Sequence, residues 1–144
     1  MLSQTAEYAL RAMAWIATNG DGQIVRAHDL SDAVDVPAHY LAKILRRLVV
    51  AELLVSHKGP GGGFGLARPP AEIRFFDVLA AVDGLPKEDK CAFGWGACDA
   101  EHPCALHPSW VELTGCFNEW AVRQTLAAVP YVGPHTVQYR RDNA

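Results

Sequence analysis

The sequence predicts a mainly α-helical protein with one small β-hairpin and a long C-terminal helix. Two short amphipathic segments, separated by a break at residues 35–37, have the spacing of paired helices. A glycine-rich stretch over residues 59–65 follows a short apolar run, as expected of a hairpin. Apolar residues between 105 and 129 recur at steps of four and three, which is typical of a long helix.

Length and composition favour a small domain with an appendage, divided here into residues 1–83 and 84–144. Half of the 144 residues are apolar and a fifth are charged, as in an ordinary globular protein. The sequence contains no apolar run of the roughly 18 residues that a membrane span needs. The N-terminus lacks the basic start of a secretory signal, so we expect a cytoplasmic protein without a membrane partner.

The charge is unevenly distributed along the chain. The formal net charge of −3 argues against a protein that coats nucleic acid. However, residues 1–68 hold seven Lys/Arg against six Asp/Glu, whereas residues 69–144 hold six against ten. If DNA is a partner, we expect a local patch in the first half to contact it.

The first half of the chain predicts a helix-turn-helix. Residues 4–18 form the first expected helix, because Ala, Leu and Met dominate and apolar side chains recur on one face. A short helix near residues 28–34 and a second from Pro37 to Ala51 follow, and proline suits the first turn of a helix. Two short helices joined by a tight turn are typical of DNA-binding helix-turn-helix units.

The second of these helices carries a basic face. Lys43, Arg46 and Arg47 are three and four residues apart, so they share one side of the helix. His39 and Tyr40 lie near its start, where side chains reach base edges when such a helix enters a major groove. The alternative is a solvated charged face on an ordinary amphipathic helix.

The glycine-rich stretch predicts the wing of a winged helix. Residues 53–56 read as a strand, and Lys58, Gly61 and Gly62 fall near the expected hairpin tip. The stretch lacks the Lys-Ser/Thr ending of a phosphate-binding P-loop, and no helix follows it directly. A hairpin beside a helix-turn-helix would hold DNA phosphates or a minor groove. The alternative is a flexible hairpin with no partner.

Two further helices are expected in the second half, over residues 73–83 and 105–129. The longer one carries more large apolar residues than one helix in so small a fold is expected to bury, which predicts a homodimer. The alternative is packing on its own domain. Residues 130–144 contain two prolines and end in charges, so we expect them to be poorly ordered. The predicted dimer seam consists of Trp110, Leu113, Phe117 and Trp120.

Between these helices the chain gathers soft metal ligands. Cys91, Cys98 and Cys104 fall within fourteen residues, and His107 follows the third cysteine closely. In a cytosolic protein, clustered cysteines are more often metal-binding or redox-active than disulfide-bonded. Thiolates with one imidazole suit an iron–sulfur cluster or zinc, although the gaps are long for a structural zinc loop. A metal-free thiol sensor is the third possibility.

Together these features resemble the Rrf-type bacterial regulators, a family that includes IscR-like and NsrR-like members. The resemblance covers nearly the whole chain. Its carriers are Glu7-Tyr8-Ala9-Leu10-Arg11-Ala12, Tyr40-Leu41-Ala42-Lys43-Ile44-Leu45, the wing at 58–66, and the three cysteines. The resemblance implies a dimeric winged-helix DNA-binding protein that often senses through an iron–sulfur cluster.

The resemblance also implies a ligand set. Cys91, Cys98 and Cys104 match the family's cluster cysteines, although the first gap here is one residue longer than is typical of IscR-like members. His107 matches the histidine that completes their 2Fe–2S site. Glu7 matches the acidic ligand that NsrR-like members donate from the other subunit, so it is an alternative fourth ligand. We expect 2Fe–2S in preference to 4Fe–4S.

The expected function is therefore transcription regulation and not enzymatic catalysis. A homodimer would bind double-stranded DNA at a two-fold symmetric operator, and the state of the cluster would control its affinity. Winged-helix regulation with structural zinc or with bare thiols is the alternative. A second alternative is an electron-transfer protein that uses the cluster for redox chemistry, but it would leave Lys43, Arg46, Arg47 and the wing unexplained. A third is a winged helix that binds a protein partner and carries structural zinc, which its metal content would reveal.

Overall fold

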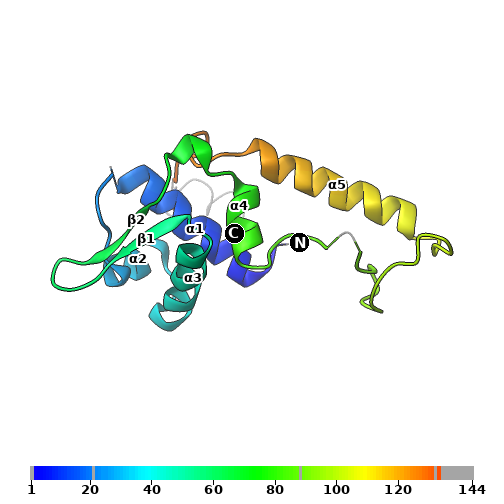
Figure 1. Ribbon diagram of the computed structural model, residues 1–144, viewed down its shortest axis with the longest axis horizontal. Coiled ribbons are helices and arrows are strands. Elements are labelled where there is room, and N and C mark those ends of the chain that lie inside the picture. The colour runs from blue at the N-terminus through cyan, green and yellow to red at the C-terminus, as the bar shows by residue number, and fades with distance from the viewer. Residues whose placement is uncertain (1, 21, 88, 132, 134–144) are drawn as a thin grey trace, which may run out of the picture.

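The computed structural model describes residues 2–20, 22–87, 89–131 and 133. It shows a mainly helical chain with a two-stranded wing, as predicted (Figure 1). The elements in order are α1 (Gln4–Asn19), α2 (Ala27–Val34), α3 (Ala38–Val50), β1 (Leu54–His57), β2 (Gly63–Leu66), the 3-10 helix η1 (Pro70–Glu72), α4 (Phe75–Ala81) and α5 (His107–Arg123).

Helix α1 lies at the centre of the fold and contacts α2, α3, α4 and β2. Its N-terminus is capped by Ser3, whose hydroxyl accepts a hydrogen bond from the Ala6 amide at 3.1 Å. Ala6, Ala9 and Ala12 are completely buried on the side that faces the other helices. Such small side chains let neighbouring helices approach closely, while Met13 and Ile16 of the same helix fill the core beside them.

The turn between α2 and α3 is held by side chains on both sides. Asp35 ends α2 in the left-handed conformation with φ of 54°, and the Ser31 hydroxyl donates to the Val36 carbonyl at 2.6 Å. From α1, the Arg11 guanidinium donates to the Val34 carbonyl at 3.0 Å. These bonds satisfy carbonyls at the end of a helix and fix the angle at which α3 leaves α2.

The wing is an antiparallel hairpin in which Leu54 pairs with Leu66 and His57 with Gly63. A short third segment joins it, because Val25 and Phe64 exchange both backbone hydrogen bonds at 2.8 Å. Glycine is required at position 63, since a Cβ there would overlap the Val25 carbonyl oxygen. The base of the wing is therefore fixed to the helical body, while its tip extends away from it (Figure 1).

Helix α5 is shorter than the periodicity predicts. It ends at Arg123 because Gln124 is extended and accepts a hydrogen bond from the Phe75 amide at 2.9 Å. The Leu126 amide then donates to the Ile73 carbonyl at 3.0 Å. The same pairing delays the start of α4 to Phe75, so the expected bounds 73–83 and 105–129 were both too wide.

The four residues of the predicted dimer seam divide into two groups. Trp120 meets Phe75 of α4 edge-on with ring centroids 5.7 Å apart, and it also contacts Phe117 at 5.5 Å. Phe117 is buried within the chain at 8% exposure, whereas Leu113 is 47% exposed. The fold itself therefore covers Phe117 and leaves Leu113 exposed, and the dimer seam stays a prediction.

The molecule is elongated, with the wing and the segment of clustered cysteines at opposite ends of its long axis (Figure 1). The C-terminal end of α5 packs on α4, and its N-terminal half projects beyond the helical body. Among the described residues, no helix is long and apolar enough to cross a bilayer. Most of the 130–144 segment, expected to be poorly ordered, lies outside the described residues.

The start of α4 makes a testable contribution to stability. The Asp77 carboxylate accepts hydrogen bonds from the Arg74 backbone amide at 2.9 Å and from its guanidinium at 2.8 and 3.2 Å. The Arg74 hydrogen bonds lower the pKa of Asp77 below its ordinary value, against a smaller opposing effect of burial. A lowered folded-state pKa means that the charged carboxylate stabilises the fold above its unfolded pKa of about 3.9.

We therefore expect Asp77→Asn to lower the unfolding free energy by about 1 kcal/mol at pH 7. The difference from the wild type should shrink as the pH falls below about 4, because the Asp77 carboxylate of the unfolded wild type then binds a proton before the folded one does. Thermal unfolding from pH 7 to pH 3 measures this. A difference that stays constant over that range would show that the charge of Asp77 contributes nothing.

Candidate functional site

The exposed face of α3 presents the side chains predicted to contact DNA. His39, Tyr40, Lys43 and Arg46 are all exposed, and the ion pairs in the described part of the chain include neither Lys43 nor Arg46. The opposite face supplies core residues Leu41, Ile44, Leu45 and Leu48, each at most 3% exposed. The helix is thus held by its apolar face while its basic face meets solvent.

Aromatic contacts support the start of α3. The rings of His39 and Tyr40 lie 4.5 Å apart, and Tyr40 meets Tyr8 of α1 edge-on at 6.3 Å. Arg11 lies over the Tyr8 ring at 5.3 Å while it donates to the helix-turn-helix turn. Sequence reasoning assigned no role to Arg11 and expected Tyr8 to pack in the core, which it contacts in part. The available signal was that Arg11 is the only Lys or Arg in α1.

Arg47 differs from the other predicted DNA-contacting residues. Its guanidinium forms a 2.7 Å ion pair with the Asp83 carboxylate, which follows α4. The side chains of Arg47 and Asp83 are 42% and 73% exposed, so water screens the pair. Arg47 therefore lies on the predicted face but already has an acidic partner.

The wing tip has the shape that its glycines allow. Gly59 and Gly61 adopt positive φ angles of 91° and 75°, and a Cβ at Gly62 would overlap the His57 carbonyl oxygen. Lys58 and Gly61 are exposed beside each other at this tip. The tip thus offers one cation and a backbone without side chains, which suits close approach to a phosphate backbone.

At the other end of the molecule, the predicted metal ligands come together. A pocket of about 170 Å³ contains all three clustered cysteines and the histidine that follows them. Its lining consists of Cys91, Trp95, Ala97, Cys98, Asp99, His102, Pro103, Cys104 and His107. Glu7 is not among these residues; it is exposed on α1.

Backbone hydrogen bonds shape this pocket. The Cys91 amide donates to the Gly96 carbonyl at 2.9 Å and the Cys98 amide to the Asp89 carbonyl at 2.7 Å, which closes a small loop. The His107 amide, at the start of α5, donates to the Cys104 carbonyl at 3.1 Å. One loop therefore holds the first two cysteines. The first residue of α5 holds the third cysteine through its backbone amide.

The pocket lining also includes a carboxylate–imidazole pair, Asp99 and His102, whose side chains are 60% and 83% exposed. Asp99 accepts hydrogen bonds from the amides of Glu101 and His102, and these lower the pKa of its carboxyl group. Its other oxygen lies 3.0 Å from Nδ1 of His102. Partial burial, and then the neighbouring Cys91 and Cys104, raise the pKa of the Cys98 thiol.

The donor set fits a thiolate–imidazole metal group. Nδ1 of His107 is buried and has no hydrogen-bond partner among the described residues, which leaves a nitrogen lone pair or N–H without a use in the fold. The four side chains line the pocket wall without converging on one point. Within the described ranges, no three histidine, cysteine or acidic side chains are placed to hold a single metal ion.

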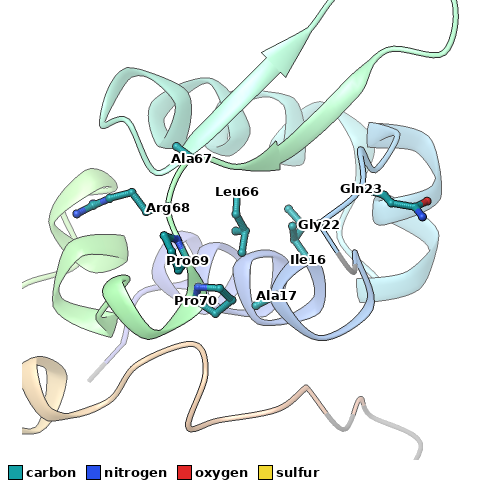
Figure 2. Close-up of a pocket in the computed structure, with 9 residues that line it drawn as sticks. All are labelled: Ile16, Ala17, Gly22, Gln23, Leu66, Ala67, Arg68, Pro69 and Pro70. Carbon is teal, nitrogen blue, oxygen red and sulfur yellow. The ribbon is translucent and has the colours of Figure 1, made fainter.

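A second pocket, of about 340 Å³, lies between α1 and β2 (Figure 2). Its walls include the apolar side chains of Ile16, Leu66 and Pro69. The side chains of Gln23 and Arg68 point away from the other lining residues (Figure 2). Ligand sites need polar groups that converge, so this pocket lacks the features of a specific binding site.

The fold and the α3 face define a class of protein. A helix-turn-helix with an exposed basic second helix, followed directly by a β-hairpin, is a winged helix-turn-helix regulator. Residues 2–130 match the Rrf2 family, described as iron-dependent transcriptional regulators. The chain belongs to the Rrf2 family and is thus a transcriptional regulator and not an enzyme.

Relatives agree with this assignment. A Mycobacterium tuberculosis protein, named only as a candidate HTH-type transcriptional regulator, is 38% identical over 89% of this chain and 80% of its own length. IscR of Cronobacter sakazakii is 31% identical over 78% of this chain and 69% of its own length. These relatives match both the DNA-binding unit and much of the remaining chain.

Two solved structures share the fold. The structure of CymR, the global cysteine regulator of B. subtilis, has a TM-score of 0.73 at 20% identity and covers 89% of this chain and 94% of its own. The structure of T. potens IscR has a TM-score of 0.70 at 23% identity and covers 89% of this chain and 84% of its own. At these identities the likeness concerns the fold alone.

Trp110 ties the cysteine pocket to α5. Its indole Nε1–H donates to the Lys90 carbonyl at 2.9 Å, immediately before Cys91. Trp110→Phe keeps an aromatic ring but removes this donor. Because one such bond contributes about 0.5–1.5 kcal/mol, we expect Cys91 in metal-free protein to react with an alkylating agent roughly two- to tenfold faster.

Mass spectrometry of peptides taken during the reaction follows each cysteine separately. Trp120→Phe is the matched control, because Trp120 lies at the far end of α5 against Phe75. It should leave the rate at Cys91 unchanged. Equal rates in Trp110→Phe and the wild type would show that this bond does not hold the loop.

Proposed function

We propose that this chain binds double-stranded DNA as a cytoplasmic homodimer and that an iron–sulfur cluster in the cysteine pocket controls its DNA affinity. One observation carries the cluster assignment. Cys91, Cys98 and Cys104 come from separate positions of an irregular segment and His107 from the start of α5, yet all four line one pocket. Thiolates with an imidazole are ligands that iron–sulfur clusters take in proteins.

The ligands would be the three cysteines and His107, with 2Fe–2S favoured over 4Fe–4S. His107 is favoured over Glu7 as the fourth ligand, because its buried Nδ1 already lies in the pocket without a partner. Glu7 lies on α1 and is absent from the pocket lining, so it would have to come from a second subunit. A bound cluster would supply a group that responds to redox state, oxygen or nitric oxide.

The DNA-binding assignment rests on two surfaces. Helix α3 would enter the major groove, with His39 and Tyr40 near base edges and Lys43 and Arg46 near phosphates or guanine. Lys58, Gly61 and Gly62 of the wing would contact the flanking backbone. Family membership supports this assignment, because Rrf2 proteins are transcriptional regulators.

The projecting half of α5 favours association of two copies. Val111 and Leu113 are 48% and 47% exposed there, and Val122 further along is 40% exposed. Val111 and Val122 are eleven residues apart and therefore share one face of the helix, where exposed apolar side chains favour an interaction surface. A symmetric dimer would place two α3 helices for a two-fold symmetric operator.

A thiol sensor without metal is the second candidate. It is favoured by the position of Cys91, Cys98 and Cys104 in the lining of one small pocket. All four cysteines of the chain are free thiols in this structure. Oxidation of one pair to a disulfide would then replace the cluster as the signal.

Anaerobic purification, followed by metal and sulfide analysis, separates these possibilities. We expect visible absorption with about two iron and two sulfide per chain. His107→Ala should change the spectrum or lose the cluster, whereas His28→Ala, on an exposed histidine of α2, should not. An unaltered His107→Ala spectrum together with a changed Glu7→Ala spectrum would make Glu7 the ligand. A colourless protein with stoichiometric zinc, or with a disulfide and no metal, would refute the cluster.

DNA binding is tested with a duplex selected by the wild-type protein from a random pool. We expect Lys43→Ala and Arg46→Ala each to weaken binding roughly tenfold or more while the cluster content stays constant. Arg123→Ala, an exposed arginine of α5, is the control. Loading or losing the cluster should change affinity about 5- to 150-fold. Unchanged DNA affinity in both α3 variants would show that α3 is not the helix that recognises DNA.

A further inference from the structure

The ion pair between Arg47 and Asp83 links the DNA-facing helix to the segment that leads toward the cysteine pocket. Arg47 lies on α3, on the same face as Lys43 and Arg46. Its Nη2 atom donates to the Asp83 carboxylate at 2.7 Å. Of the α3 cations that the structure describes, Arg47 is the one held by an acid of its own chain.

We infer that Asp83 competes with DNA phosphate for Arg47 and thereby limits DNA affinity. This inference rests on the proposed function, because it takes α3 as the helix that contacts DNA. A carboxylate and a phosphate oxygen accept the same guanidinium hydrogens. While Asp83 occupies them, Arg47 cannot neutralise a phosphate or release its counterions.

The pair has the properties of an exchangeable contact. Both side chains are partly exposed to solvent, at 42% for Arg47 and 73% for Asp83. Exposed pairs are weak in water, so a phosphate brought to α3 can displace the carboxylate. Competition between the Asp83 carboxylate and DNA phosphate therefore lowers the DNA affinity of the protein but does not prevent DNA binding.

The backbone fixes where the carboxylate can reach. Asp83 has a positive φ of 54° directly after α4, and the Gly84 amide that follows donates to the Leu79 carbonyl at 2.8 Å. This turn ends α4 and directs the Asp83 side chain toward α3. Asparagine tolerates the same backbone conformation, so Asp83→Asn removes the charge without disturbing the turn.

The same turn faces α5 across a pocket. Asp83 lines a pocket of about 480 Å³ together with Trp110 and Leu113, and Trp110 also binds the Lys90 carbonyl beside Cys91. A change in the cysteine loop that moves Trp110 therefore reaches the segment that positions Asp83. The ion pair is thus the point at which the state of that loop can alter a DNA contact.

The test measures binding to a fluorescent random-sequence duplex over a range of salt concentrations, because phosphate contacts do not depend on sequence. We expect Asp83→Asn to raise affinity about two- to fivefold at low salt, the range that an exposed ion pair spans. The slope of log affinity against log salt should steepen by about 0.9 for each Arg47 that gains a phosphate. In an Arg47→Ala background, Asp83→Asn should change nothing.

Glu52→Gln is the matched control. Glu52 is also an exposed acid at a positive φ, of 59°, and it follows α3, but it has no ion pair among the described residues. Removing its charge tests the general electrostatic effect on a DNA-binding surface. A gain that is equal in Glu52→Gln, or that persists in the Arg47→Ala background, would overturn the inference, as would unchanged or weaker binding by Asp83→Asn.

The two proposals fail in different ways. If Lys43→Ala and Arg46→Ala weaken binding but Asp83→Asn has no effect, α3 binds DNA and the competition by Asp83 is refuted. If none of the three substitutions alters binding, α3 does not contact DNA, and both proposals are refuted together.

Discussion

The close packing of α1 against three other helices is the constraint on which the rest of this structure depends. Three alanines at spacings of three residues, Ala6, Ala9 and Ala12, are wholly buried where α2, α3 and α4 meet. The chain after α4 also passes close to α1, since a Cβ at Gly84 would lie 3.0 Å from that of Ala6. A larger side chain on this face would displace the turn that carries Asp83, and with it a contact of α3.

Much of this arrangement follows from local sequence. The helix-turn-helix, the wing and the gathering of Cys91 to His107 were predictable, because each is determined by the periodicity, the turn residues or the ligand types within a short stretch. Longer-range pairing was not predictable. The end of α5 and the burial of Phe117 depend on backbone bonds between residues 73–75 and 124–126, about fifty positions apart. Neither stretch has a sequence pattern that predicts which part of the chain it pairs with.

Exposed contacts between distant polar residues were also missed. Arg47 and Asp83 are 36 residues apart and both lie at the surface, where charge patterns are common and carry little information. The roles of Asp99 and His102 in the pocket depend on how an irregular loop closes, and no periodicity describes such a loop. Sequence therefore identified the chemistry of each region better than it identified the contacts that connect the regions.

The two ends of the molecule are connected by one hydrogen bond, one shared pocket and one ion pair. The cysteine loop meets Trp110, Trp110 shares a pocket with Asp83, and Asp83 meets Arg47. The hydrogen bond and the ion pair are each weak in water. Couplings between distant sites in proteins typically amount to about 1–3 kcal/mol, which a small number of such contacts can supply.

The position of the cysteine loop separates the proposed sensing from folding. Among the described residues from 89 to 106, no side chain is buried, so the hydrophobic core is complete without this segment. In small metal-dependent domains, by contrast, the bound ion supplies the free energy of folding and its loss unfolds the chain. Here a few substitutions in the loop could exchange one bound metal group or thiol chemistry for another without unfolding the protein. Damage to the thiols would likewise leave the fold and helix α3 intact.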